Sequence, residues 1–211
     1  MLAEVKSSID LRRPDDALQW ANEANIKRPW RYSIFDYYAD EILQQAAYGQ
    51  ILEIGAGPGY LAKHLLQRCP HIQYTAFDFS DAMHTLSRNK LDTEELARSQ
   101  FITGDFKQPE WERFITIQSA QRGFDVIIIH QALHELRHKV HAPLFHQAVK
   151  KLMHENSLYF VCDHIFATGA MQNNDLYMSI DEHLDALHQA NFKKIQFIRE
   201  LKGLAVFKVQ E

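Results

Sequence analysis

A short apolar strand that runs directly into three closely spaced glycines is the feature that most constrains this chain. Residues 51–60 read ILEIGAGPGY, so Gly55, Gly57 and Gly59 follow the strand segment at alternate positions. Glycine lets the backbone turn tightly and approach a ligand closely. The residues after Gly59 have the apolar spacing of a helix. The segment therefore predicts a strand–turn–helix unit with a ligand at the turn.

Strands and helices alternate from Gln50 to the end of the chain. The sequence predicts strands over residues 72–77, 101–103, 124–129 and 158–162, with helices over 81–89 and 142–154. The run FDVIII at 124–129 lacks polar alternation, which is typical of a central strand buried on both faces. Ser179 and Glu182 have capping-box spacing and begin a last helix, which ends at Ala190. Alternating strands around Lys202-Gly203 then predict an antiparallel hairpin. This order predicts an α/β, doubly wound fold.

The first 49 residues lack this alternation and read as helical. Pro14 is a plausible helix start, Lys27-Arg28-Pro29 interrupts the pattern, and Gly49 ends it. We therefore divide the chain into an N-terminal helical cap over 1–49 and an α/β domain over 50–211. The aromatic stretch 30–38 within the cap is either a lid over a pocket or a packing helix.

Composition excludes several classes of partner. The 211 residues carry 23 Lys and Arg against 27 Asp and Glu, and a mildly acidic chain without long basic runs suits no nucleic acid. No apolar run approaches the roughly 18 residues of a membrane span, and the N-terminus lacks the apolar core of a signal peptide. Cys69 and Cys162 imply no disulfide framework and are most simply buried. We expect a cytoplasmic protein with neither nucleic acid nor membrane as partner.

Two residues near the glycines argue against a dinucleotide. The dinucleotide fingerprint G-x-G-x-x-G/A needs a small residue at position 60, where Tyr60 stands. Glu53 also places a carboxylate close to where a pyrophosphate would lie, and two neighbouring anions repel each other. A ligand with a positive centre and no phosphate fits better, and S-adenosylmethionine is such a ligand.

On these residues the chain resembles the class I S-adenosylmethionine-dependent methyltransferases. Glu53, Gly55, Gly57 and Gly59 are similar to that family's first motif, E-x-G-x-G-x-G. Asp78 lies nineteen residues past Gly59 and resembles the acidic residue that binds both ribose hydroxyls. The resemblance extends over about residues 50–211. It implies a Rossmann-like, seven-stranded, mostly parallel sheet that ends in an antiparallel hairpin.

The same resemblance implies a set of cofactor-binding residues. Segments 79–83 and 104–106 resemble the stretches that surround adenine, and 124–134 resembles the fourth motif of members that act on small molecules. The implied set is Glu53, Gly55, Ala56, Gly57, Gly59, Asp78, Phe79, Met83, Gly104, Asp105, Phe106 and His130. The cofactor would be S-adenosylmethionine and its product S-adenosylhomocysteine.

Two histidines are the catalytic candidates. An oxygen or nitrogen nucleophile that enters protonated benefits from a nearby base, and imidazole has a suitable pKa. His134 follows the carboxyl end of the fourth strand, where α/β sheets bind ligands, and His164 follows the fifth. Each is otherwise a packed or hydrogen-bonded histidine. We expect Tyr32 and Tyr37, with His134, to contact substrate, and residues 165–178 to shape the substrate pocket.

Other functions compete with this interpretation. Residues 134–138 read HELRH, which satisfies the helical zinc motif of metallopeptidases, with Glu135 as base. The motif begins just after a strand, however, and no third ligand follows at a recognised spacing, so we expect no metal. A cofactor-binding protein without catalysis, serving as a partner or sensor, is the other alternative. The sequence favours a methyltransferase that acts on O or N of a small molecule, and leaves the oligomeric state open.

Overall fold

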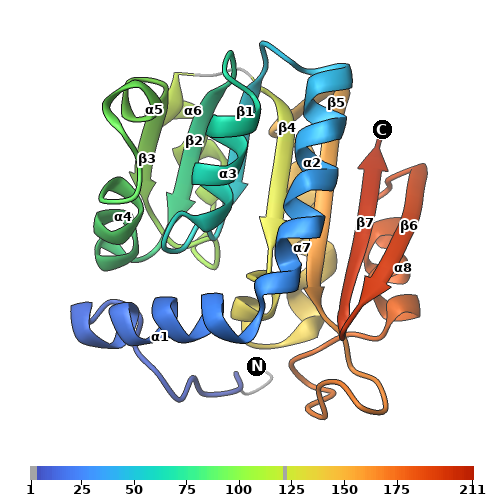
Figure 1. Cartoon of the computed structure of the whole chain (residues 1–211). Coiled ribbons are helices and arrows are strands. Elements are labelled where there is room, and N and C mark those ends of the chain that lie inside the picture. Colours follow the sequence, from blue (N-terminus) through green and yellow to red (C-terminus); the bar gives the residue numbers. More distant parts are fainter. Residues whose placement is uncertain (1–3, 121–122) are drawn as a thin grey trace.

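The computed structural model describes residues 4–120 and 123–211 and is built around one twisted, seven-stranded sheet (Figure 1). The strand order is β3-β2-β1-β4-β5-β7-β6. The strands are β1 (Gln50–Ile54), β2 (Gln73–Asp78), β3 (Ser99–Thr103), β4 (Phe124–His130), β5 (Met153–His164), β6 (Lys194–Leu201) and β7 (Leu204–Gln210). β1 to β5 pair in parallel, whereas β7 pairs antiparallel with both β5 and β6. The predicted doubly wound sheet with a terminal hairpin is confirmed.

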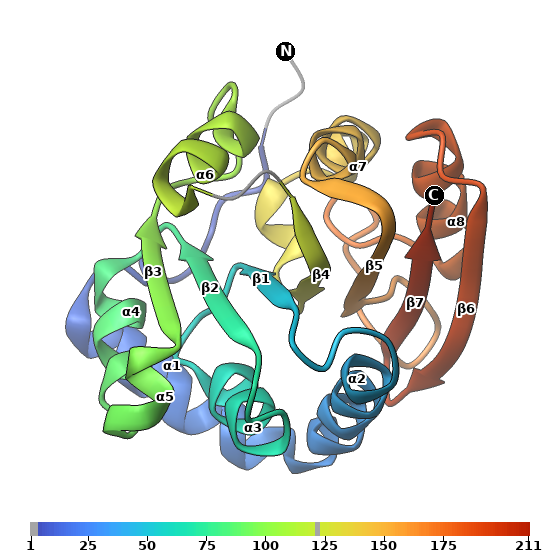
Figure 2. The same ribbon diagram turned by 90° about the horizontal axis from the view of Figure 1, so that it is seen from above.

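Helices cover both faces of this sheet (Figure 2). They are α1 (Pro14–Lys27), α2 (Tyr32–Gln45), α3 (Tyr60–Arg68), α4 (Asp81–Arg88), α5 (Thr93–Ala97), α6 (Trp111–Ser119), α7 (Ala142–Lys150) and α8 (Ile180–Gln189). One core lies under α6, α7 and α8, and the other lies under α2 and α3. Side chains of β1 and β4 enter both cores, because successive residues of a strand point to opposite faces.

Several local predictions are confirmed. Ser179 caps α8, and the Ser179–Glu182 capping box is formed in both directions. Lys202 and Gly203 both adopt positive φ in the hairpin turn, at 49° and 81°. Cys69 and Cys162 are buried free cysteines.

Other boundaries differ from the sequence prediction. The helix predicted over 142–154 ends at Lys150, and β5 begins at Met153 rather than near residue 158. Tertiary pairing explains this difference, because Met153 lies opposite Phe124 and extends the sheet past the point where the apolar run begins. The short helices α5 and α6 were not predicted at all. Five-residue α5 depends on a capping box formed by Asp92 and Glu95 rather than on an apolar stripe.

The N-terminal region is helical only from Pro14 onward. Residues 4–13, which we call the strap, run beside the carboxyl ends of the strands without regular structure. The strap exchanges hydrogen bonds with the rest of the chain instead of forming a helix. Val5 N–H donates to Arg137 O at 2.8 Å, and Ser80 Oγ donates to Leu11 O at 2.6 Å. Residues 1–3 of the predicted cap lie outside the described residues.

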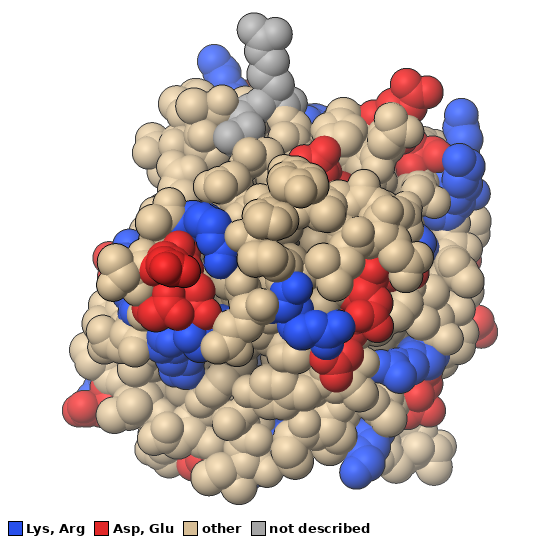
Figure 3. Space-filling model, turned by 45° about the horizontal axis from the view of Figure 1, so that its top comes forward, with Lys and Arg blue, Asp and Glu red and all other residues tan. Residues whose placement is uncertain are grey.

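Helix α2 belongs to the core that it shares with α3. Residues 30–38 therefore pack against the sheet rather than forming a lid. Ile34, Phe35 and Tyr38 are at most 1% exposed and pack against the sheet with α3. The packing alternative therefore holds for this stretch. In the described part of the chain, no helix has both the length and the apolar character to cross a membrane. On the face shown in Figure 3, basic and acidic side chains are intermixed.

Candidate active site

The candidate site lies at the carboxyl ends of the central strands. The strand order reverses between β1 and β4, which is the switch point where open α/β sheets bind ligands. Helix α1 crosses this edge of the sheet (Figure 1), and the strap runs next to it. The loops after β1 to β5 therefore face a space that the N-terminal region partly closes.

Glycine is needed at the three positions after β1 for different structural reasons. All have positive φ, from 56° to 82°. A Cβ on Gly55 would lie 2.3 Å from Ala132 Cβ, and one on Gly59 would lie 2.8 Å from Ser87 Cα, so both allow close packing. A Cβ on Gly57 would meet nothing within 4 Å. Gly57 is therefore the glycine that borders open space, as a close approach by a ligand requires.

Two buried carboxyl groups flank this turn. Glu53, 3% exposed, accepts a hydrogen bond from the Tyr74 hydroxyl, and burial together with the Asp78 carboxylate raises its pKa well above the usual range. Asp78 accepts hydrogen bonds from Gly57 N–H at 2.7 Å and Ser80 N–H at 2.9 Å. Burial nevertheless raises the pKa of Asp78 to about 6. Neither acid has a cation in contact within the described residues, so each ionises at a cost.

A first cavity of about 600 Å³ lies beside Phe79, the residue that follows Asp78. Its wall on the sheet side includes Phe79, Asp105 and Phe106, three residues of the predicted cofactor set, and the strap forms much of the opposite wall. The other residues of the predicted set do not line it. Met83 is buried in α4, Ala56 is 5% exposed beside β1, and Gly104 packs against Phe77. The structure thus gathers the predicted set around one edge but opens a cavity at only part of it.

Two further residues with unpaired buried atoms lie behind the glycine turn. His130, at the end of β4, is 8% exposed; its Nδ1 lies 3.3 Å from the Tyr38 hydroxyl, and its Nε2 has no partner among the described residues. Burial and the nearby Arg31 guanidinium lower the pKa of His130 to about 3, so it is neutral. Arg31 is 5% exposed, its Nε has no partner in the part of the chain that the structure describes, and its charge also acts on Glu53. Sequence reasoning missed Arg31 because nothing in its local pattern marks it.

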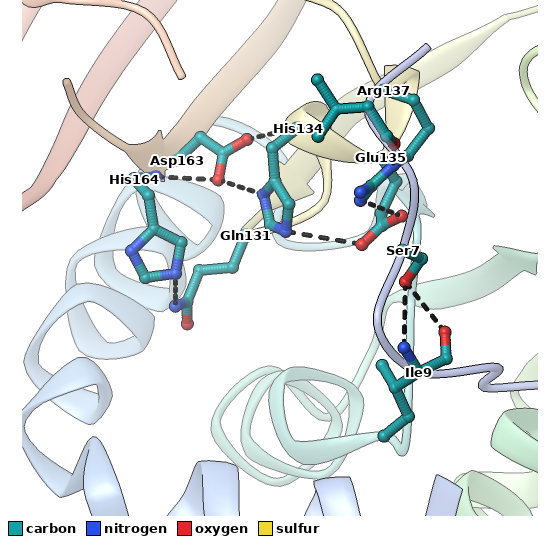
Figure 4. Close-up of polar contacts among 9 residues, drawn as sticks. Ser7, Ile9, Gln131, His134, Glu135, Arg137, Asp163 and His164 are labelled. Atoms are coloured by element: carbon teal, nitrogen blue, oxygen red, sulfur yellow. Dashed lines mark hydrogen bonds and ion pairs between the residues drawn. The ribbon is translucent and has the colours of Figure 1, made fainter. Parts of the chain in front are cut away.

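His134 forms a dyad with Asp163 on the other side of the switch point (Figure 4). Asp163 Oδ1 lies 2.8 Å from His134 Nδ1, and Asp163 Oδ2 accepts a hydrogen bond from the backbone N–H of His134 at 2.6 Å. Burial lowers the pKa of His134, but the Asp163 carboxylate more than offsets this and raises it above its ordinary value. The same contact holds the pKa of Asp163 at about 2 despite burial. Nδ1 is thereby fixed as the donor, and Nε2 remains for a ligand.

His134 Nε2 borders a second cavity, of about 310 Å³. The His134 Nε2 atom lies 3.5 Å from Glu135 Oε1, which is longer than a good hydrogen bond. Arg137 donates to the other Glu135 carboxylate oxygen at 3.2 Å. His164 lines the same cavity, with its Nε2 3.0 Å from Gln131 Nε2. Burial lowers the pKa of His164 to about 4, which makes it a weak base. The predicted substrate loop contributes Met171, Leu176 and Tyr177 to this wall.

The HELRH segment does not form the helix that a zinc site of this type needs. His134 lies in a 3₁₀ turn over Leu133–Leu136, and His138 precedes a second turn over Lys139–His141. Arg137 between them has a positive φ of 63°, so the two imidazoles do not share a helix face. Within residues 4–120 and 123–211, no group of three or more His, Cys, Asp or Glu side chains is placed to hold a metal ion.

The structure does not bring Tyr32 and Tyr37 to either cavity. Tyr32 packs edge-on against Phe35, and its hydroxyl donates to Asn25 at 3.2 Å. Tyr37 packs against Phe160 on the face of α2 that meets the sheet. We therefore leave both tyrosines out of the site considered below.

A family model described as a methyltransferase domain matches residues 52–158, just over half of the chain. The malonyl-acyl-carrier-protein O-methyltransferase of Paenibacillus sp. (strain JDR-2) is 28% identical over 89 residues. That match covers 42% of this chain and 30% of the relative, so it spans less than a third of the relative's length.

Solved structures of methyltransferases share the fold. Human N-acetylserotonin methyltransferase in complex with S-adenosylmethionine superposes with a TM-score of 0.67 at 14% identity, over 95% of this chain and 57% of that chain. DhpI in complex with S-adenosylhomocysteine gives 0.65 at 16% identity, over 94% and 95%. An O-methyltransferase family protein from Burkholderia thailandensis gives 0.66 at 11% identity, over 95% and 63%. This chain therefore spans less than two thirds of the first and third of these structures.

Proposed function

The chain belongs to the methyltransferase family whose domain model it matches, and we propose that it transfers a methyl group from S-adenosylmethionine to oxygen or nitrogen of a small molecule. One observation carries the proposal. Two buried carboxyl groups with raised pKa values stand at the glycine turn, and a histidine–aspartate dyad stands across the switch point from them. The first pair suits a cationic cofactor, and the dyad suits an acceptor that must lose a proton.

The residues at the turn fit this cofactor. In this proposal Asp78 accepts the ribose hydroxyls once its bond from Gly57 N–H is exchanged, and the open space at Gly57 supports the approach of the ligand. Phe79 and Phe106 offer apolar surface for adenine, with Asp105 beside them. These assignments extend the predicted set and are part of the proposal.

The methionine end of the cofactor fits the unpaired groups behind the turn. Arg31 has a buried guanidinium atom without a partner, which suits the carboxylate of the methionine moiety. In this arrangement Glu53 lies near the ammonium group of the methionine moiety. The Nε2 atom of the neutral His130, which has no partner among the described residues, can bind to the same ammonium group. When bound, S-adenosylmethionine supplies an electrophilic methyl group on a sulfonium centre.

On the acceptor side, the dyad provides the base. His134 Nε2 takes the proton of the acceptor hydroxyl or amine, while Asp163 fixes Nδ1–H and stabilises the imidazolium that forms. The raised pKa of His134 makes this proton transfer more favourable at neutral pH. The strap and α1 close the edge of the sheet, which limits water near the reacting atoms.

The kind of acceptor is supported by the surface and by the relatives. The intermixed charges in Figure 3 show no extended basic patch on that face of the kind that binds a nucleic-acid backbone. The structural neighbours named above include O-methyltransferases. A cytoplasmic location stays a prediction from the composition and the two unpaired cysteines.

Isothermal titration of the metal-stripped protein with S-adenosylhomocysteine tests the proposal, with zinc measured on an unstripped sample. We expect saturable one-to-one binding without stoichiometric zinc. A screen of hydroxyl and amine acceptors with methyl-labelled S-adenosylmethionine then tests transfer. No binding, together with about one zinc per chain, would overturn the cofactor assignment. Binding with no transfer to any acceptor would favour the non-catalytic sensor.

A further inference from the structure

An arginine without a partner lies in the wall of the second cavity. Arg28 ends α1 and is partly buried, and burial lowers the pKa of its guanidinium. No hydrogen bond or ion pair of this side chain occurs with any residue in 4–120 or 123–211. A guanidinium stays charged at any physiological pH, so its partial burial costs free energy unless an anion meets it.

Two other arginines near this edge, Arg137 and Arg12, are already paired. Arg137 donates to Val5 O at 2.8 Å and to Glu135 at 3.2 Å, and Arg12 donates to Asp10 at 2.8 Å. These pairs are structural, since both partners belong to the chain. Arg28 is different because it lines a cavity and its charge acts on Tyr177 and His164, two other residues of the same wall.

Aromatic and imidazole rings form one part of the wall, beside apolar and polar side chains. Tyr177 lies 5.5 Å from His134 and 6.0 Å from His164 between ring centroids, and these two histidines are 5.7 Å apart. Trp20 of α1 also lines the cavity. A volume of about 310 Å³ is at the small end of the roughly 300–1,000 Å³ typical of ligand pockets. The ring-lined part of the wall and the small volume together suit a single flat ring.

The negative groups near the cavity do not oppose an anion there. Glu135 lines the same space, but its carboxylate is shared between Arg137 and His134. Asp163 is 2% exposed and is fully engaged with His134. Lys6 of the strap lines the cavity as well and adds a second positive charge.

We propose that the acceptor is a small hydroxylated aromatic acid, whose carboxylate pairs with Arg28 while its hydroxyl lies at His134 Nε2. This assignment rests on the proposed methyl transfer. The hydroxyl oxygen forms a bond to the methyl carbon, and the carbon–sulfur bond breaks with its electron pair left on sulfur. The hydroxyl proton passes to His134 Nε2. The products are a methoxy acid and S-adenosylhomocysteine.

Paired probes test the charge directly. The protein is first saturated with S-adenosylhomocysteine, and benzoate and benzamide are then titrated separately by calorimetry. The two probes have the same ring and nearly the same shape, but only benzoate is an anion. We expect benzoate to bind at least about tenfold more tightly, because a charge-assisted bidentate pair replaces a neutral hydrogen bond. The 2-, 3- and 4-hydroxy derivatives of both probes then locate the hydroxyl.

Three variants identify the residue responsible. Arg28→Gln should bring the benzoate-to-benzamide preference close to one, and Arg28→Lys should keep part of it. Lys27→Gln is the matched control, because Lys27 is the neighbouring exposed cation and pairs with Glu23. It should leave the preference unchanged. All three variants should still bind S-adenosylhomocysteine, which also reports that they are folded.

Equal binding of benzoate and benzamide to the wild type, or failure of both to bind, would overturn the assignment of an acidic acceptor. So would a preference that survives in Arg28→Gln. Failure of the wild type to bind S-adenosylhomocysteine in the first step would instead contradict the proposed function. The two failures are therefore separate observations.

Discussion

Asp78 and Asp163 are both buried carboxyl groups at the ligand-binding edge of the sheet, yet their pKa values are shifted in opposite directions. On the β2 side, two backbone N–H groups do not compensate for burial, and the pKa of Asp78 is raised to about 6. On the β5 side, the His134 imidazole more than compensates, and the pKa of Asp163 falls to about 2. Both side chains are at most 5% exposed, so burial alone does not explain the difference.

From this comparison we propose that the two halves of the site are prepared for different ligands. On the cofactor half, Glu53 and Asp78 raise each other's cost of ionisation, and a cationic ligand with hydroxyl groups would relieve it. On the acceptor half, His134 is already oriented by Asp163 before any ligand binds. The first half gains its partner on binding, whereas the second is preorganised for proton transfer.

Removing the base should have the largest effect on turnover. We expect His134→Ala to lower kcat by about 100- to 10,000-fold, the range for loss of general-base catalysis. Rates with an acceptor found in the screen, measured at saturating cofactor, check this. His138→Ala is the matched control, because its ring nitrogen only accepts a bond from Val140 N–H on the surface. Similar rates in wild type and His134→Ala would remove the catalytic role.

Breaking the dyad from the other side should change the pH profile. A base must be unprotonated, so kcat/KM should rise with pH through the pKa of His134, which lies above its ordinary value of about 6.5. Asp163→Asn removes the charge that raises this pKa. We expect the acid limb to move to lower pH, and the rate to fall about 10- to 100-fold. A rate loss with an unmoved acid limb would mean that Asp163 is only structural.

Arg31 tests the cofactor half without altering the dyad. Arg31→Gln should weaken S-adenosylhomocysteine binding about tenfold, because one charge-assisted bond to the methionine carboxylate is lost. Arg31→Lys should restore part of the affinity. Decarboxylated S-adenosylhomocysteine provides the second arm of a double-mutant cycle, since it lacks the carboxylate. If Arg31→Gln weakens both ligands equally, the assigned contact is wrong.

Glu53 should give the smallest effect, and it concerns stability. When a carboxyl group has a higher pKa in the folded state than in the unfolded state, binding of its proton stabilises the folded state. This contribution to the free energy of unfolding is lost as pH rises from about 4, the unfolded pKa, through the folded pKa. Glu53→Gln removes this loss and keeps an oxygen for the Tyr74 hydroxyl. We expect the unfolding free energy at pH 8 to rise by about 1 kcal/mol.

Thermal unfolding of Glu53→Gln at pH 5 and pH 8 measures this gain, and Glu155→Gln on the exposed part of β5 is the control. The gain should be larger at pH 8, where the buried carboxyl of the wild type has less of its proton. A variant that is less stable than wild type at both pH values would show that Glu53 is not a source of repulsion in the free protein.

The cofactor half could be predicted from sequence because its contacts are local. Gly57 and Asp78 belong to one β–α–β unit, and the glycine spacing and the acidic residue after β2 are visible in the letters. His134 was also predicted, from its place after β4. Its partner Asp163 was not, because the pairing depends on the register that places Cys162 opposite His130. That register comes from packing of the whole sheet.

The residues that come from the first 49 positions of the chain were the hardest to predict. Arg28 and Arg31 lie around a helix break that has no motif, and only the folded chain brings them to the site. The sequence of the strap has no periodicity that would predict its position either. Its hydrogen bonds go to Arg137 and Ser80, which are distant from it in the sequence. Tyr32 and Tyr37 were chosen for their chemistry, but the apolar stripe of α2 packs that helix against the sheet.

The central claim is that the two halves act separately, one on the cofactor and the other on the acceptor. Titration of S-adenosylhomocysteine into Asp78→Ala and His134→Ala, side by side with wild type, tests it most directly. We predict that Asp78→Ala weakens binding about 100-fold, the loss of two strong hydrogen bonds, and that His134→Ala binds as wild type does. Unchanged affinity in Asp78→Ala, or an equal loss in both variants, would contradict this division of the site.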